Sequence, residues 1–291
     1  MAPFPFRRLV VALTCAVVCL ALSSVALRAQ ETPAQPASSN SPAAVDGLAS
    51  ATAAADDAAH GQSSSKAIAR RDVSLDLFPR NFLRDQQTLL SFPLQLAAGR
   101  QWAPAITVSA ATVALLSADP HVDPYFVRTS AFGSFNRVFA SNITGVETIL
   151  APAALYAVGR YTRDSYMEKT ALFAAEAVAD SEVLRMFLNS STTRWRPQDI
   201  FAPRTYWNTF FHSPSYVGSS FPSGHMIAAV SIATVIARRY RNHRWVPWAA
   251  YGFAGAIGFS RITLRTHFPS DVFLGTVLGY AIARYEVLED P

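Results

Sequence analysis

Reactive thiols are almost missing from this chain. Its 291 residues include two cysteines, Cys15 and Cys19, both near the N-terminus. They lie in the apolar segment Leu9–Leu22, which follows Arg7-Arg8 and precedes small residues, and this pattern predicts a signal peptide over residues 1–29. Removal of that segment leaves no cysteine, which excludes disulfide bonds and thiolate chemistry from the mature chain.

Lysine is equally scarce, and the positive charge is modest. Of the 25 lysine and arginine residues, only Lys66 and Lys169 are lysines. The formal charge of +5 falls to +2 without the signal peptide, because that segment carries three arginines and no acidic residue. This balance gives no support to a nucleic-acid partner, and we expect none.

Aromatic residues are missing from residues 30–71. This stretch is rich in alanine, serine and proline, and it offers too little apolar surface to offset the entropy lost on ordering. We therefore expect a disordered linker there. Residues 72–291 are long enough for one sizeable core and predict a single domain.

Patterns typical of β-hairpins are also nearly missing from the predicted domain. Its apolar runs have helical length and are rich in alanine, leucine, valine and isoleucine. Pro104, Pro222 and Pro269 lie just before or within first turns, where proline is tolerated. We expect an all-α helical bundle with its site built from helix ends and connecting loops. The predicted helices are Asn81–Leu96, Pro104–Ser117, Ile143–Gly159, Lys169–Leu188, Gly224–Tyr240, Trp245–Phe259 and Ser270–Leu288.

The predicted apolar stretches are mostly about 13–17 residues long, whereas a straight membrane span needs about 20. Topology adds a conflict. A cleaved signal places the N-terminus outside, and counting spans from there puts the four-arginine turn at residues 238–244 outside as well, against the preference of positive charge for the cytoplasm. These arguments favour an exported periplasmic or cell-envelope domain with peripheral membrane contact over an integral membrane protein.

Three short strings near the C-terminus carry the chemistry. Together they supply arginines, histidines, a serine hydroxyl, a glycine and a carboxylate, which is the set a phosphoryl-transfer pocket needs. The strings are Arg196-Pro197, Pro222-Ser223-Gly224-His225, and Ser260-Arg261 followed by His267 and Asp271.

The order and spacing of these strings resemble the type 2 phosphatidic acid phosphatase and vanadium haloperoxidase superfamily. The resemblance covers residues 189–271, and the second and third strings are complete. It implies a helical phosphatase that works through a phosphohistidine.

By this resemblance, His267 attacks phosphorus and His225 protonates the leaving oxygen. Asp271 is expected to accept a hydrogen bond from the His267 ring nitrogen that faces away from the substrate. Two alternatives compete with these roles. Ser270 or Asp271 fits ordinary helix capping, and a histidine such as His225 among apolar neighbours is commonly a core residue.

The resemblance also implies a phosphate-binding set. Arg196 and Arg261 are expected to hold the equatorial oxygens, and Ser223 with Gly224 offers a hydroxyl and backbone N–H groups at a helix start. The alternative for an arginine is a surface charge or a structural ion pair, which we assign to Arg194 and Arg265.

One position departs from the family pattern. The first string of the family begins with a lysine seven residues before its arginine, and here Asn189 occupies that position. Asparagine donates a hydrogen bond but carries no charge. Arg185, one helical turn earlier, is on the same helix face and is a candidate replacement. The alternative is a degenerate, non-catalytic family member.

The loop between the first two strings, residues 198–221, is rich in aromatic residues. It forms either a substrate wall or a packed cover on the bundle, and its His212 fits a structural role. The histidines outside the strings have no partner at metal-ligand spacing, so we expect no metal and no cofactor.

The sequence thus predicts an exported, metal-independent phosphohydrolase for phosphate monoesters or pyrophosphates. The expected substrate is a phosphorylated small molecule or a lipid. The alternative within the same family is a vanadate-dependent haloperoxidase, because vanadate occupies the same kind of pocket as phosphate.

Overall fold

A computed structural model describes residues 71–139, 141–202, 204–212 and 218–289, without side-chain surroundings for 141–149. The predicted signal peptide and all but the last residue of the predicted linker lie outside these residues. That last residue, Arg71, corrects the linker boundary. Its buried side chain forms ion pairs with Asp85 (2.7 Å) and Glu176 (2.5 Å), so it belongs to the folded domain.

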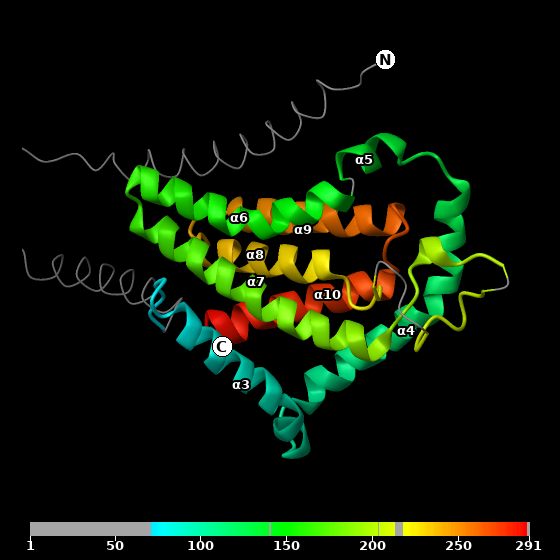
Figure 1. The fold of residues 1–291 in the computed structure, drawn as a ribbon, viewed down its shortest axis with the longest axis horizontal. Coiled ribbons are helices and arrows are strands. Elements are labelled where there is room, and N and C mark those ends of the chain that lie inside the picture. The colour runs from blue at the N-terminus through cyan, green and yellow to red at the C-terminus, as the bar shows by residue number, and fades with distance from the viewer. Residues whose placement is uncertain (1–70, 140, 203, 213–217, 290–291) are drawn as a thin grey trace, which may run out of the picture. The chain divides into compact units, whose positions relative to one another are not determined.

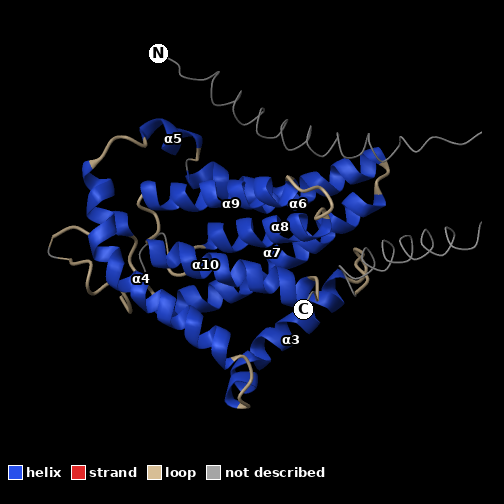
Figure 2. Ribbon diagram, turned by 180° about the vertical axis from the view of Figure 1, so that it is seen from behind, coloured by secondary structure: helices blue, strands red, loops and turns tan. Residues whose placement is uncertain are grey.

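The described residues form helices and no strand, which confirms the all-α prediction (Figures 1 and 2). All seven predicted helices are present, and a short helix, α5, was not predicted. The helices are α3 (Phe78–Ala97), α4 (Trp102–Arg128), α5 (Gly133–Val138), α6 (Ser141–Thr162), α7 (Ser165–Thr192), α8 (Gly224–Arg239), α9 (Val246–Thr263) and α10 (Pro269–Ala281), with a 3-10 turn at Pro197–Asp199 and a π-helical turn at Ile282–Val287.

Helix α8 is the central helix of the bundle. Its side chains from Met226 to Val235 are all buried, which is the pattern of a helix surrounded by other helices. It packs against α7, α9 and α10, and it lies between α9 and α10 in Figure 1. The N-terminus of α8 is thereby held at a fixed place, close to the ends of its neighbours.

Two glycines allow α10 to approach α8 closely. A Cβ atom added at Gly279 would lie 2.4 Å from the carbonyl oxygen of Ile227, and one added at Gly275 would lie 2.7 Å from that of Ser223. The Ser223 N–H also donates to the Asp271 carbonyl at 3.1 Å, which joins the two helix beginnings through the main chain. Any larger residue at these glycines would push the helices apart.

Helix α4 is longer than the sequence predicted, and the expectation of short apolar segments is wrong for it. It continues past Ser117, through Pro120 and Pro124, to Arg128. The extension buries Asp119 and Asp123, four residues apart on one helix face, and these carboxylates pair with Arg194 and Arg265. Partners distant in sequence therefore hold this segment helical although its prolines disfavour a helix.

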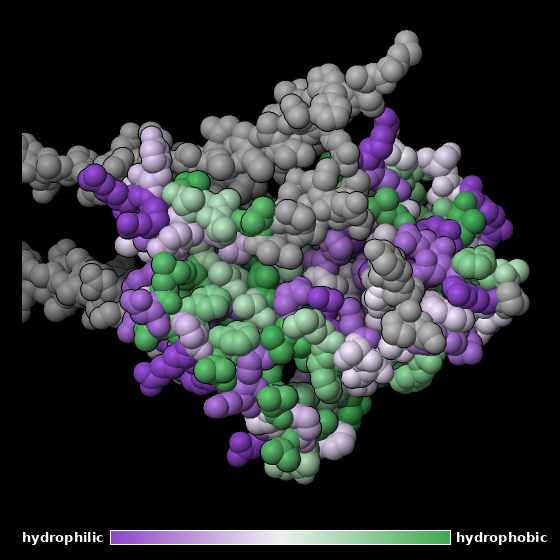
Figure 3. All heavy atoms as spheres, in the orientation of Figure 1, coloured by the Kyte–Doolittle hydropathy of each residue, from purple (hydrophilic) through white to green (hydrophobic). Residues whose placement is uncertain are grey.

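Most of α4 is exposed although it is apolar. Among the described helices it alone is long and apolar enough to cross a membrane, and 11% of its most apolar stretch is buried. Ile106 (58%) and Val113 (64%) are exposed on α4, and Leu90 (78%) and Leu94 (73%) are exposed on α3. Figure 3 shows hydrophobic side chains on the lower surface, where α3 and α4 meet. We call the exposed apolar surface of these two helices the α3–α4 apolar face.

Replacing Gly279 with alanine tests the close contact of α8 with α10. The new methyl group overlaps a backbone oxygen that cannot move aside, so we expect Gly279→Ala to lower the free energy of unfolding by about 1–3 kcal/mol. Chemical denaturation of the purified protein measures this change.

Gly255→Ala is the matched control, because a Cβ at Gly255 meets no atom within 4 Å. It lies within α9, so both substitutions exchange a helical glycine for alanine. Equal stability of the two variants would contradict the proposed close contact.

Candidate active site

The three strings of the sequence converge at one end of the bundle. Arg196 follows α7, Ser223 begins α8, Arg261 ends α9 and His267 precedes α10. These helix ends lie together at the right of Figure 1. The site is therefore built from helix ends and loops, as predicted.

The beginning of α8 forms the floor of the site. Ser223 is the N-cap residue of α8, yet its side chain caps no backbone N–H. Its hydroxyl is buried and has no hydrogen-bond partner among the described residues. A buried hydroxyl beside the N–H groups of a helix start suits an anion, because the helix dipole favours negative charge there.

His267 is almost fully buried and its ring orientation is fixed. Its Nδ1 lies 2.7 Å from the carbonyl oxygen of Ser220. A carbonyl accepts but does not donate, so Nδ1 carries the proton in the neutral ring and Nε2 keeps its lone pair. Burial lowers the pKa of His267, against the opposing effect of Asp271, and this favours the neutral ring with a nucleophilic Nε2.

The second histidine faces the first. The ring centres of His225 and His267 lie 6.2 Å apart, with 65° between the ring planes. His225 is half-buried at the second position of α8. The two imidazoles thus approach edge to face at one place in the structure.

The two predicted phosphate-binding arginines lie at the same end of the bundle as the histidines, and Arg261 donates to the Phe139 carbonyl and to the Ser260 hydroxyl. Arg196 donates to the Thr266 carbonyl at 3.3 Å and its charge acts on His267. Arg261 is fully buried, and burial together with the neighbouring Arg196 lowers its pKa to about 10. Both guanidinium groups remain charged at neutral pH. The carboxylates of Asp199 and Asp271 also act on Arg196 and oppose the repulsion between the two guanidinium groups.

The predicted hydrogen bond between Asp271 and His267 is not formed. The Asp271 carboxylate lies 3.8 Å from His267 Nδ1, which is ion-pair distance but too long for a hydrogen bond. Its Oδ2 instead accepts from the Phe268 N–H at 2.8 Å, the helix-capping alternative. The carbonyl of Ser220 takes the orienting position, and Asp271 acts on the imidazole through its charge.

Arg194 is a residue whose importance the sequence did not reveal. Its side chain is buried and forms ion pairs with Asp271 (2.5 Å) and Asp119 (2.7 Å). Of the two predicted alternatives for Arg194, the structural ion pair is therefore observed and the surface charge is not. Its guanidinium lies over the Phe268 ring, 4.0 Å from the centroid. Arg194 thus ties the loop after α7 to α4 and α10. No local pattern signals this, because its carboxylate partners are about 75 residues away in the chain.

The predicted structural roles of Arg265 and His212 are confirmed. Arg265 pairs with Asp123 at 3.0 Å. His212 stacks on Trp195 with ring centres 3.5 Å apart and its Nε2 lies 2.8 Å from the Asn208 carbonyl.

The aromatic loop combines both predicted alternatives. Phe210 packs on Arg194 and on Phe221, as a cover would. Phe201, Trp207 and Phe211 are exposed, as residues of a wall would be. Tyr216 lies outside the described residues.

Asn189, which stands where the family pattern has a lysine, and Arg185, its candidate replacement, also lie at this site. The Arg185 side chain crosses Gly224 so closely that a Cβ there would lie 2.4 Å from its Cδ. Asn189 lies against the Phe221 carbonyl. Every residue predicted for the site is therefore placed at this end of the bundle.

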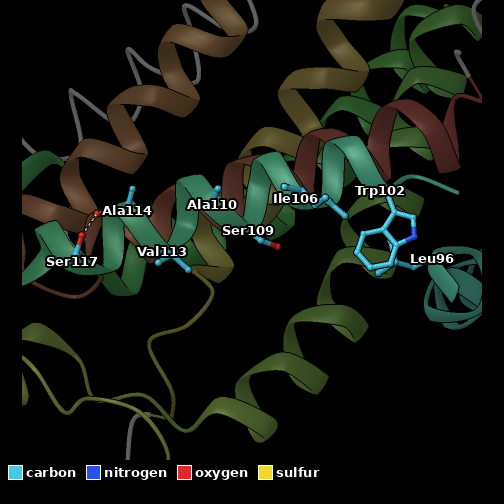
Figure 4. A pocket seen from close by; sticks show the side chains of 9 residues that line it. Leu96, Trp102, Ile106, Ser109, Ala110, Val113, Ala114 and Ser117 are labelled. Atoms are coloured by element: carbon cyan, nitrogen blue, oxygen red, sulfur yellow. Dashed lines mark hydrogen bonds between the residues drawn. The ribbon is translucent and has the colours of Figure 1, made fainter. Parts of the chain in front are cut away.

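An apolar groove lies away from the motif residues. It has a volume of about 670 Å³ and is lined by α4 and the end of α3, with Leu96, Trp102, Ile106 and Val113 among its lining residues (Figure 4). Its lining contains no charged group, so it suits hydrocarbon and not phosphate. It forms part of the α3–α4 apolar face.

Among the described residues, no group of three or more histidine, cysteine, aspartate or glutamate side chains is arranged to hold a metal ion. The polar groups that converge at the site are mainly donors: guanidinium, hydroxyl and backbone N–H. Such groups suit an oxyanion, either phosphate or vanadate.

Comparison with known proteins agrees with this chemistry. Residues 170–288 match the family model of the PAP2 superfamily, which confirms the resemblance predicted from the three strings. The match begins within α7 and contains every predicted site residue.

Two curated relatives come from Bacillus. The bacitracin transport permease protein BcrC of Bacillus licheniformis is 29% identical over 131 residues, 45% of this chain and 59% of the relative. The undecaprenyl-diphosphatase BcrC of Bacillus subtilis (strain 168) is 32% identical over 97 residues, 31% of this chain and 49% of the relative. The chain thus spans about half the length of these relatives.

A solved structure also shows some likeness. It is the first transmembrane PAP2 type phosphatidylglycerolphosphate phosphatase from Bacillus subtilis, 21% identical, and the match covers 69% of this chain and 93% of that chain with a TM-score of 0.36. A score this low does not by itself establish a common fold.

Removing the Arg194 charge tests its bridging role. Arg194→Gln leaves two buried carboxylates without their cation, and we expect the free energy of unfolding to fall by about 3–5 kcal/mol. Chemical denaturation measures the loss.

Arg160→Gln serves as the control, because the Arg160–Glu168 pair is long (3.6 Å) and the Arg160 side chain is largely exposed. We expect that substitution to change stability by less than about 0.5 kcal/mol. An equally small effect of Arg194→Gln would refute the bridging role.

Proposed function

Because residues 170–288 match the PAP2 superfamily, we propose that the protein is a phosphatase that hydrolyses phosphate monoesters or diphosphates through a phosphohistidine. One observation carries the proposal. His267, with a proton-bearing Nδ1 held by a carbonyl, lies 6.2 Å from His225 between ring centres, and Arg196 and the buried Ser223 hydroxyl lie at the same helix ends.

Substrate binding uses the anion-suited groups. Arg196 and Arg261 hold the non-bridging phosphate oxygens, and the Ser223 hydroxyl with the first N–H groups of α8 binds the oxygen nearest the helix. The arginines, rather than a metal ion, supply the positive charge. They stabilise the negative charge that spreads over the equatorial oxygens in the transition state.

The first chemical step forms a bond from His267 Nε2 to phosphorus as the bond from phosphorus to the leaving oxygen breaks. The protonated His225 gives its proton to that oxygen, so the alcohol or the monophosphate leaves with a hydroxyl group at that position. The nearby Asp271 carboxylate stabilises the positive charge that develops on the His267 ring.

The second step reverses these roles. Neutral His225 takes a proton from a water molecule, whose oxygen bonds to phosphorus while the bond to His267 Nε2 breaks. Inorganic phosphate is released, and both histidines return to their starting protonation states.

We further propose a lipid diphosphate, of the isoprenyl type, as the preferred substrate. One relative is an undecaprenyl-diphosphatase. In this chain, α4 connects an apolar surface to the site, because Asp119 binds Arg194 while Ile106 lies in the apolar groove. Thirteen residues of helix span about 20 Å, a distance that suits a hydrocarbon chain with its phosphate end in the site.

The α3–α4 apolar face is proposed to contact the lipid bilayer. Exposed leucine, isoleucine, valine and tryptophan side chains over two helices are unfavourable in water and favourable in hydrocarbon. This proposal fits a cell-envelope enzyme with a predicted signal peptide. The sequence predicted only peripheral membrane contact, because the apolar runs were too short to span a bilayer. That reason does not hold for α4, so we propose that α4 inserts into the bilayer.

His267→Ala is the central test of the proposed reaction. We expect turnover of isoprenyl diphosphate and of a soluble phosphate monoester to fall by at least about 10³-fold, since the nucleophile is missing. Rapid acid quenching with labelled substrate should trap a phosphoenzyme in the native protein and none in this variant. His212→Ala is the control, because His212 is structural and its loss should leave turnover largely unchanged.

Undiminished turnover by His267→Ala would reject the phosphohistidine mechanism. Halide oxidation after addition of vanadate and peroxide, without phosphatase activity, would instead favour the haloperoxidase alternative.

A charged residue on the α3–α4 apolar face tests membrane contact. If Ile106 lies in lipid, Ile106→Asp should shift the protein from the carbonate-resistant membrane fraction toward the soluble or degraded fraction, since a carboxylate in hydrocarbon costs about 3 kcal/mol. Tyr161→Asp, at an exposed end of α6, is the control and should not change the fractionation. Native protein in the soluble fraction would refute the membrane proposal.

A further inference from the structure

We propose that Arg185 replaces the missing family lysine as the third phosphate-binding cation, and that Glu182 and Asn189 hold it in place. This inference rests on the proposed function and names a specific device of this chain. The three residues lie at i, i+3 and i+7 on α7, so they share one face of the helix.

Both neighbours bind the Arg185 guanidinium. Its Nε donates to the Glu182 carboxylate at 2.7 Å. With the Asn189 amide in the orientation that satisfies its surroundings, the amide oxygen accepts from Arg185 Nη1 at 3.0 Å and the amide nitrogen donates to the Phe221 carbonyl at 2.6 Å. No described residue accepts a hydrogen bond from Nη2, so that donor remains for a ligand.

The guanidinium is directed toward the beginning of α8. The Arg185 side chain passes over Gly224, where a Cβ would lie 2.4 Å from Cδ and 3.1 Å from Nε. Only glycine leaves space for this path. Gly224 therefore does more than begin α8, because the absence of a side chain there leaves space for the Arg185 side chain.

Electrostatics places Arg185 in the same cluster as the other cations. Its positive charge lowers the pKa of Arg196, whose own burial has the larger effect. Arg196 in turn acts on Arg261 and His267. Arg196 thus interacts with the like charges of Arg185 and Arg261, while Asp199 and Asp271 oppose that repulsion, and an anion bound among these guanidinium groups would relieve it further.

This arrangement explains why an asparagine at position 189 is compatible with a cation at position 185. A lysine at position 189 would lie four residues from Arg185 and repel it. An asparagine there supplies no charge, but it fixes the arginine by one hydrogen bond and the loop before α8 by another. The cation has moved by one helical turn, and the residue at its former position has become its support.

Four variants test the proposal with isoprenyl diphosphate and with inorganic phosphate. Loss of one charge-assisted contact by Arg185→Gln should lower kcat/KM about 10- to 100-fold and weaken inorganic phosphate binding, measured by calorimetry, to a similar degree. Arg185→Lys should retain more activity than Arg185→Gln. Asn189→Lys alone should give no gain, because two cations then compete for one place.

The double variant Arg185→Gln/Asn189→Lys restores the family arrangement. We expect its kcat/KM to exceed that of Arg185→Gln by about tenfold or more. Arg160→Gln, an arginine substitution remote from the site, is the control for a general loss of charge. Melting temperatures of all variants identify any that fail to fold.

Unchanged phosphate affinity and turnover in a folded Arg185→Gln variant would overturn the inference, and so would a large gain from Asn189→Lys alone. Failure of the proposed function is a separate result. If native protein turns over no phosphate substrate, or His267→Ala retains turnover, the phosphatase proposal falls, while phosphate binding still tests the place of Arg185.

Discussion

The close approach of α8 to α10 is the constraint on which the rest of the site depends. Two glycines of α10 let the helices meet backbone to backbone, and the hydrogen bond from Ser223 N–H to the Asp271 carbonyl joins their first turns. His225 and His267 are carried at these two helix beginnings. Their mutual distance is therefore set by main-chain contact and does not depend on flexible side chains.

The arginines at this end of the bundle have different kinds of partner. Arg194 has two carboxylate partners at hydrogen-bond distance and is electrically satisfied. Arg261 donates to the main-chain carbonyl of Phe139 and to the Ser260 hydroxyl, and it lies near Arg196. These surroundings are set by the fold and not by the local sequence, since Arg194 and Arg196 are two residues apart in the chain.

Helix positions were predictable because they depend on local pattern, and apolar runs located seven helices. The three strings were predicted to meet, and the structure brings them to one end of the bundle. The end of α4 was not predictable, because it depends on Arg194 and Arg265 donating to Asp119 and Asp123 across a long separation in the chain. The partner of His267 was missed for a similar reason. A carbonyl oxygen leaves no mark in the sequence, whereas the nearby carboxylate of Asp271 suggested a familiar triad.

The carbonyl of Ser220 has a consequence for how this site can change over generations. Every amino acid supplies the same main-chain oxygen, so no single codon change at position 220 deletes the acceptor that selects the imidazole tautomer. Only a shift of the loop path would do so. The tautomer is thus protected from point mutation, and a scan of side chains would not detect the group that controls it.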